Sequence, residues 1–215
     1  MLELNIHICT SGRIVTNRIV MLKEEIIRNE FLEAARLLFQ QYGLQKTTME
    51  DIARALGKGK STLYYYYANK DEVFQAVVLK EIDEVSKAVH QKVIEAQTAK
   101  EKLTAYAANN INEIKGKTIL YKLVCGELKG NLTKKMFNLR GQFDAKEIEI
   151  LKEILAFGVN SKEFSSIKIE DINILAHLIS SALRGIEVDM FIENKIPNLE
   201  DQIDHLLGIL IRGLA

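Results

Sequence analysis

The chain of 215 residues has few of the residues that interrupt helices or form disulfides and metal sites. It contains one proline, Pro197, and strict alternation of apolar and polar residues is hard to find, whereas helical spacing recurs from position 23 onward. These patterns predict an all-α fold. The two cysteines, Cys9 and Cys125, are far apart and form no CxxC motif, which argues against a disulfide framework or a zinc site.

Long apolar runs are also missing. No segment approaches the roughly 18 uncharged apolar residues of a membrane-spanning helix. Near the N-terminus, Glu3 and the polar residues at positions 10–13 interrupt any apolar core of a secretory signal. We therefore expect a cytoplasmic protein with no membrane partner.

Signatures of catalysis are absent as well. The four histidines stand singly at positions 7, 90, 177 and 205, and no HExxH, GxSxG, Walker or Rossmann pattern occurs. The stretch GKGKS at 57–61 is too short for a phosphate loop and lacks a preceding strand. The sequence predicts no metal, no cofactor and no enzymatic activity, although such patterns do not test catalysis by residues distant in sequence.

Residues 47–70 are the most informative part of the chain. Thr48 is expected to be an N-cap, because its hydroxyl can accept from the backbone N–H of Asp51 while the Asp51 carboxylate reaches back. An apolar stripe follows over positions 52–56, and Gly57 provides the permissive backbone that a sharp turn needs. A second helix should begin near Gly59.

On a helical wheel, Leu63 and Tyr67 share the inward face of this second helix. The opposite side carries Ser61, Thr62, Tyr64 and Tyr65. So short a helix cannot bury four successive tyrosines, so at least two rings must meet solvent or a partner. The basic residues Arg54, Lys58, Lys60 and Lys70 have no acid among them, although the whole chain has 29 basic and 29 acidic residues. A locally basic surface predicts contact with a polyanion.

The stretch AARLLFQQYGLQKTTMEDIARALG, continuing through TLYYYYANKDEVF, resembles the DNA-binding domain of TetR-type (tetracycline-repressor-like) regulators. The resemblance covers about positions 23–78. Two residues depart from it: Gly59 stands where the family more often has serine or threonine, and Tyr67 replaces the more usual phenylalanine. The first departure leaves the operator contacts in doubt.

The resemblance implies a three-helix helix-turn-helix head over residues 23–69 and a helical ligand-binding and dimerisation body over 70–215, joined by a long helix. The first helix is expected over 23–42, and body helices near 100–115, 117–130, 132–157, 169–193 and 199–214. The inward residues of the first helix are expected to be Ile27, Phe31, Ala34, Leu38 and Tyr42. Residues 1–22 form an extension without helical periodicity: either Met21 is the natural start, or the extension is an arm that touches DNA through Arg13 and Arg18.

The last two expected helices are rich in apolar residues. They carry Ile172, Leu175, Leu178, Ile179, Ala182, Leu183 and Ile186, then Leu199, Ile203, Leu206, Leu207, Leu210 and Leu214. One chain could bury both faces by itself. The resemblance instead favours a homodimer in which these helices pair with their copies as a four-helix bundle.

Two heads related by a twofold axis would read a palindrome with half-sites about one helical turn, or a multiple of it, apart. Lys60, Ser61, Thr62 and Tyr65 are expected near base edges, with the Tyr64 ring at a thymine methyl or its OH at a phosphate. The other expected DNA contacts are Lys58 and the phosphate clamps Thr47, Thr48, Tyr66 and Lys70. Alternatively, Tyr64 and Tyr66 are ordinary packing residues.

In regulators that the sequence resembles, the body binds a small-molecule effector. Residues that mix rings and polar groups on the expected body helices are candidate contacts: Tyr106, Asn109, Asn110, Tyr121, Cys125, Phe137, Phe143 and His177. Residues of these types are more often ordinary core or surface than ligand contacts. The sequence predicts a ligand-responsive, DNA-binding transcriptional regulator, and repression is the commoner mode of the family that it resembles. The alternative is a ligand-binding or adaptor protein that keeps the fold and no longer reads DNA.

Overall fold

The structure is a computed structural model, which describes residues 11–117, 133–191 and 208–209. Its described elements are helical, as the sequence predicted. The chain divides into two compact units, residues 1–77 and 78–215. The boundary falls inside α4, Lys70–Glu95, which runs through it as one uninterrupted helix. A long continuous helix at this place was also predicted.

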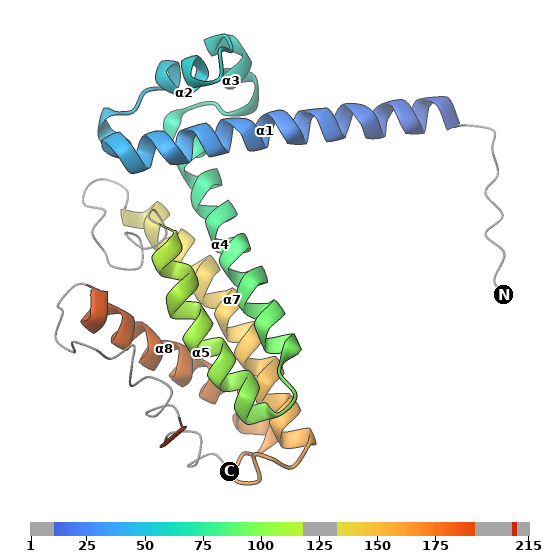
Figure 1. Cartoon of the computed structure of the whole chain (residues 1–215), viewed down its shortest axis with the longest axis vertical. Helices are drawn as coiled ribbons and strands as arrows, with labels where there is room; N and C mark the ends of the chain where they lie inside the picture. The colour runs from blue at the N-terminus through green and yellow to red at the C-terminus, as the bar shows by residue number, and fades with distance from the viewer. Residues whose placement is uncertain (1–10, 118–132, 192–207, 210–215) are drawn as a thin grey trace. The chain divides into compact units, whose positions relative to one another are not determined.

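The first unit is built from α1 (Ser11–Lys46), α2 (Met49–Ala55), α3 (Lys60–Tyr66) and the start of α4. Figure 1 shows α2 and α3 as two short helices on the same side of α1. The core of this unit is formed by Phe31, Leu32, Ala34, Ala35, Phe39, Ile52, Ala53, Leu63, Tyr67, Val73 and Phe74, all buried. The ring centroids of Phe39 and Phe74 lie 5.7 Å apart, so α1 and the start of α4 share one aromatic contact.

Two expectations for the first helix were wrong. The helix begins at Ser11 rather than at residue 23, so residues 11–22 are helical although they lack an apolar period. Tyr42 is 53% exposed instead of buried. The backbone breaks at Gly43, one residue after Tyr42, where φ is +81°. Tyr42 instead lines an open groove with Lys46, Thr47 and Arg54.

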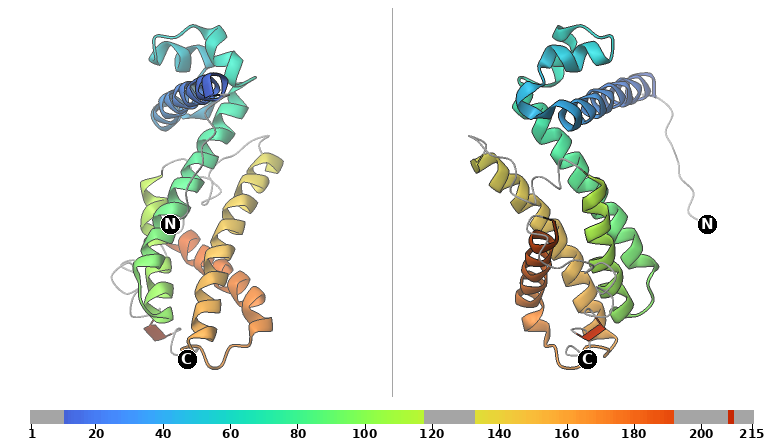
Figure 2. Two further views of the ribbon diagram at one scale, coloured as in Figure 1. Left: turned by 90° about the vertical axis from the view of Figure 1, so that its right-hand side faces the viewer. Right: turned by 60° about the vertical axis from the view of Figure 1, so that its left-hand side comes forward.

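The second unit contains the rest of α4 and α5 (Ala99–Gly116), α7 (Thr133–Asn160), the short helix η1 (Ile169–Asp171) and α8 (Ile172–Phe191). These agree with the predicted helices within a few residues. The predicted helix over 117–130 lies almost wholly outside the described residues, as does the one over 199–214, of which only residues 208 and 209 are described. Figure 2 shows α7 with α5 on one side and α8 crossing it.

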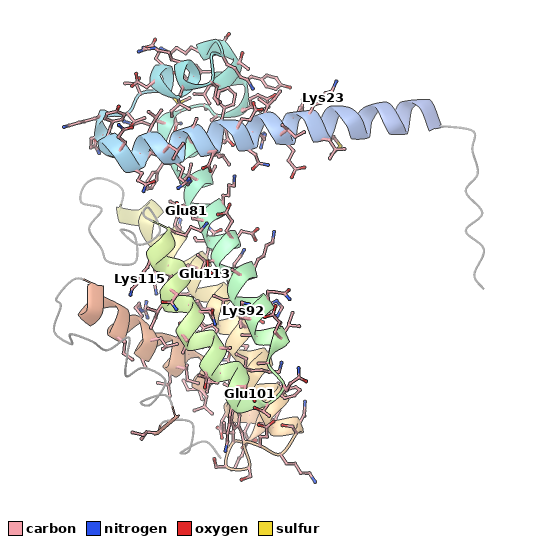
Figure 3. All side chains as sticks on the ribbon, viewed as in Figure 1. Lys23, Glu81, Lys92, Glu101, Glu113 and Lys115 are labelled. Carbon is pink, nitrogen blue, oxygen red and sulfur yellow. The ribbon has the colours of Figure 1, made fainter. Side chains whose placement is uncertain are left out.

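Local signals explain where two of these elements begin and end. The Thr98 hydroxyl accepts from the backbone N–H of Glu101, and the Glu101 carboxylate accepts from the backbone N–H of Thr98, so a reciprocal cap starts α5. Figure 3 labels Glu101 at this end of the helix. At the end of α7 the chain folds back so that Phe164, 1% exposed, packs on Gly158. None of the helices in the described part of the chain is long and apolar enough to cross a membrane.

Candidate nucleic-acid interface

The start of α2 has the predicted cap. The Thr48 hydroxyl accepts from the Asp51 backbone N–H at 3.1 Å, and the Asp51 carboxylate accepts from the Thr48 backbone N–H at 3.0 Å. The Thr48 hydroxyl also donates to Asp51 Oδ2 at 2.6 Å, and this bond, followed by the bond from the Thr48 backbone N–H, holds the pKa of Asp51 below its usual range. The prediction is confirmed, and α2 therefore starts at a defined residue against α1.

The turn between α2 and α3 depends on Gly57, whose φ is +62°, a backbone conformation that side chains other than glycine rarely adopt. The turn closes with a bond of 3.0 Å from the Lys58 backbone N–H to the Ala53 carbonyl. Gly59 is the N-cap of α3, as predicted, and makes no side-chain cap bond. The turn thus presents α3 at a fixed angle to α2.

The two faces of α3 are also as predicted. Leu63 is 0% and Tyr67 7% exposed, so both anchor the helix in the core. Tyr64 and Tyr65 are 44% and 74% exposed, and Ser61 and Thr62 lie on the same outward side. Hydroxyls and aromatic rings on one exposed helical face have the donors, acceptors and apolar surface that base edges require.

Tyr66 lies between the buried face and the outward face of α3. It is half-buried: its ring centroid lies 6.0 Å from that of Phe31, and the Arg28 guanidinium lies 5.7 Å from the ring. Arg28 also lies 5.9 Å from the ring of Tyr67. Two residues of α1 therefore hold Tyr66 against the scaffold, which is the packing role that the sequence left open. The sequence analysis did not single out Arg28, because this contact joins residues 38 positions apart.

The cations of this surface are paired with acids. Lys60 Nζ donates to Glu50 Oε1 at 2.7 Å, Lys58 Nζ pairs with Glu30 of α1, and Arg54 lies 3.8 Å from Asp51. The hydrogen bond with Glu50 raises the pKa of Lys60, and the same bond lowers the pKa of Glu50. The stretch 54–70 itself has no acid, but the fold brings carboxylates from outside the stretch beside its basic residues.

Two residues predicted as phosphate clamps make hydrogen bonds to the end of α1. Thr47 is 2% exposed, and its hydroxyl donates to the Gly43 carbonyl at 2.9 Å. Lys70 Nζ donates to the carbonyl oxygens of Leu44 at 2.7 Å and Gln45 at 3.3 Å, near the end of α1. Both residues therefore fasten the end of α1 in place. A signal for Lys70 existed in the sequence, because Gly43 ends a helix and leaves carbonyl groups that favour a cation.

In the second unit, three of the candidate ligand contacts are buried, and two of these three meet at Glu147 of α7. The sequence analysis did not name Glu147. Asn110 Nδ2 donates to Glu147 Oε1 at 2.6 Å, and the Tyr106 hydroxyl lies 3.4 Å from the same oxygen. Phe143 is 1% exposed and lies one turn away, with the Arg140 guanidinium 5.2 Å from its ring. Burial raises the pKa of Glu147, itself 4% exposed, to about 7.

The remaining candidates do not join this cluster. Asn109 is partly exposed and donates to the Ala105 carbonyl of its own helix at 2.7 Å, and His177 is exposed on α8. Tyr121, Cys125 and the side chain of Phe137 lie outside the described residues. No group of three His, Cys, Asp or Glu side chains among the described residues could hold a metal ion.

Comparison with known proteins gives this arrangement a family. The family described as "Bacterial regulatory proteins, tetR family" matches residues 31–77, which contain the second half of α1, all of α2 and α3, and the start of α4. Over these residues the chain is similar to the tetR family. The resemblance predicted from the sequence is thereby confirmed, and the matched residues are those that build the interface described above.

The chain is 23% identical over 139 residues to the HTH-type transcriptional repressor KstR2 of Rhodococcus jostii, covering 65% of the chain and 68% of KstR2. It is 41% identical over 46 residues to the regulator YhgD of Bacillus subtilis, covering 21% of the chain and only 24% of YhgD. These relatives are transcriptional regulators, in agreement with the prediction of a DNA-binding regulator rather than an enzyme.

The solved structure of the transcriptional regulator FadR from Bacillus subtilis, in complex with stearoyl-CoA, has a TM-score of 0.67 with this chain. The two are 19% identical, and the alignment covers 86% of this chain and 98% of FadR. The similarity extends through both units and confirms the predicted fold, an all-α protein with a helix-turn-helix head and a helical body.

Proposed function

We propose that this chain is a tetR-family repressor that binds a palindromic operator as a homodimer in the cytoplasm and leaves it when a small molecule occupies its helical body. The observation that carries the proposal is the outward face of α3. There, Ser61, Thr62 and Tyr65 are exposed beside Lys60, while Leu63 and Tyr67 fix the helix from behind. A rigid helix with this face fits the major groove.

An exposed apolar stripe on α8 supports the dimer. Ile174 and Leu178 are 56% and 57% exposed, and Ala182 and Gly185 continue the same face at helical spacing. The other face of α8 is buried through Ala176, Ser180 and Leu183. Large apolar residues on one exposed stripe mark a protein-binding surface, and small residues beside them allow a second helix to approach closely.

The buried polar cluster around Glu147 supports a sensing role for the body. It joins α5, α7 and α8 through Asn110, Glu147 and Ser180, whose hydroxyl lies 3.4 Å from Glu147 Oε2. A ligand that exchanged these bonds would change how the three helices pack, and only such differential binding can shift a protein between two arrangements. Because FadR was solved with stearoyl-CoA, acyl-CoA compounds are the first effectors to test.

The decisive experiment is selection of duplexes from a random pool by the full chain, carried out at about 50 mM and about 200 mM salt, since specific binding persists as the electrostatic contribution falls. We expect an enriched sequence with twofold symmetry at both salt concentrations. Enrichment of no sequence would overturn the proposal and favour the alternative of a ligand-binding protein that no longer reads DNA. Addition of acyl-CoA to the selected complex then tests release.

The role of α3 is tested by Lys60→Ala. If Lys60 contacts a base, operator affinity should fall by about 1–3 kcal/mol and preference should relax at one position of each half-site. Fluorescence anisotropy with a set of single-base operator variants measures both effects. The matched control is Lys92→Ala, which removes an equally exposed lysine paired with Glu95 in the second unit. An equal loss with every operator variant would contradict base contact by Lys60.

A further inference from the structure

The lysines at the start of α3 are opposed by carboxylates from two other helices. Lys60 is bonded to Glu50 of α2 at 2.7 Å, and Lys58 is paired with Glu30 of α1. Across the expected head, residues 23–69, the sequence holds seven basic and six acidic side chains. A DNA-binding head with so little net charge is unusual, because attraction to phosphates supplies nearly all of the affinity for nonspecific DNA.

The two pairs differ in what they can do. The side chain of Lys58 is 28% exposed, and its ammonium lies 5.4 Å from the buried Phe31 ring, so its pair with Glu30 fastens α1 to the turn before α3. The side chains of Lys60 and Glu50 are 47% and 57% exposed. Lys60 also lies 5.7 Å from the Tyr64 ring on the outward face. The Glu50–Lys60 pair therefore stands on the surface that would meet DNA.

Glu50 lies in the first turn of α2, where its negative charge favours the helix start, and its side chain is bonded to Lys60. The cap of α2 is provided by Asp51, its neighbour, whose carboxylate bonds to Thr48. Glu50 points instead to the first turn of α3. On a generic duplex, Lys60 must leave this carboxylate to reach a phosphate, and the freed carboxylate is then repelled by the phosphates around it.

We propose that Glu50 is a specificity-determining residue. On nonspecific DNA, Glu50 stays bonded to Lys60, and Lys60 leaves Glu50 only where a base edge takes the place of the carboxylate. The inference rests on the proposed reading of DNA by α3. Exposed ion pairs are weak in water, so a well-placed acceptor such as the guanine O6 and N7 atoms can displace Glu50. A mobile phosphate contact gains only a screened attraction, so a phosphate displaces Glu50 from Lys60 less readily.

The test is Glu50→Gln, which keeps the shape of the side chain and an acceptor for Lys60 and removes the negative charge. We expect affinity for a scrambled duplex to rise about threefold to tenfold at low salt, with one further unit in the slope of log K against log salt. Affinity for the selected operator should change less than about twofold. The ratio of operator to scrambled affinity should therefore fall by at least about 1.5-fold.

Two controls separate this effect from others. Glu149→Gln removes the same charge from an exposed pair with Lys152 in the second unit, at 2.9 Å, and should leave the ratio unchanged. In a Lys60→Ala background, Glu50→Gln should no longer steepen the salt slope, because its effect requires Lys60. An unchanged slope in the single variant, or a persistent effect without Lys60, would overturn the inference.

A loss of operator affinity of tenfold or more in Glu50→Gln would also overturn it, because Glu50 would then contact a base, for example a cytosine amino group. The wild-type protein decides the proposed function independently. If the wild-type chain prefers its operator and Glu50→Gln keeps the same preference, only the inference about Glu50 fails.

Discussion

Tyr66 differs from the tyrosines on either side of it because of what lies opposite it, not because of its own chemistry. Each step along α3 turns the side chain by about 100°, so four identical residues enter four environments. Tyr65 reaches solvent, Tyr67 enters the core, and Tyr66 meets Phe31 and Arg28 of α1. The outward surface of α3 is therefore narrower than its composition suggests, and its aromatic part reduces to Tyr64 and Tyr65.

A buried carboxyl group gives a prediction for pH. Glu147 is surrounded by Tyr106 and Asn110 of α5, Ser180 of α8, and Arg140 and Asp144 of its own helix. Its pKa is raised from 4.5 to about 7, so between these values the folded chain holds a proton that the unfolded chain has released. The stability contributed by this site is therefore fully present below about pH 4.5 and is lost as the pH rises through about 7.

Glu147→Gln should remove this pH dependence. The free energy of unfolding from urea titrations at pH 5, 6, 7 and 8 should fall less steeply in the variant, by on the order of 1 kcal/mol per pH unit in the titrating range. Glu149→Gln, an exposed change two residues along the same helix, should follow the wild type. Parallel curves for the wild type and Glu147→Gln would show that Glu147 ionises normally in the folded protein.

At the scale of single residues, the sequence predicted contacts between near neighbours correctly and missed contacts between residues far apart in the chain. The cap of Thr48 and the inward direction of Leu63 and Tyr67 depend on neighbours within four residues, and all three were predicted correctly. The bonds from Lys58 to Glu30 and from Lys70 to Leu44 join residues 28 and 26 positions apart. No periodicity carries such information, so the charge balance of the interface could not be predicted.

At the scale of elements, the same distinction holds for helices. Caps and apolar spacing located α2, α3, α5, α7 and α8, because each helix has its own start signal or stripe. The beginning of α1 was missed since residues 11–22 have neither. Their helicity continues that of residues 23–42, and helix propagation costs far less than nucleation. A polar segment that extends an established helix leaves no signal of its own.

The contact that ends α7 can be tested by Gly158→Ala. A Cβ atom at Gly158 would lie 2.1 Å from Cδ2 of Phe164, so the buried ring would have to move. We expect a loss of about 1–3 kcal/mol in the free energy of unfolding, as for other overpacked cores.

Gly141→Ala is the matched control for that substitution, because Gly141 lies in the same helix and nothing approaches its added Cβ within 4 Å. It should stabilise the protein by about 0.5–1 kcal/mol through helix propensity. Chemical denaturation of both variants shows whether the free energy of unfolding falls in Gly158→Ala and rises in Gly141→Ala. Equal effects would mean that Phe164 does not pack on Gly158 in solution.

At the scale of the whole molecule, a helix rather than a flexible linker connects the two compact units. Val73 and Phe74 of α4 are buried in the first unit, and Val85, Val89 and Val93 of the same helix are buried in the second. Residues of α4 therefore contribute to the core of each unit. This connection is what the proposed effector response would require.

The proposed dimer yields the corresponding prediction. Leu178→Glu places a charge in the middle of the exposed stripe on α8, where burial against a second copy would leave it unpaired. We expect sedimentation velocity to show a monomer where the wild type is a dimer. Operator affinity should fall by about 100-fold or more, because two linked heads bind with an avidity that one head lacks.

Binding to a single half-site should remain close to wild type in Leu178→Glu, since the head itself is unchanged. The control is Ile169→Glu, which introduces the same charge at an apolar residue that is 72% exposed on η1, outside the α8 stripe. It should remain dimeric and keep its operator affinity. A Leu178→Glu protein that stays dimeric and binds the full operator normally would require the dimer to form through another surface.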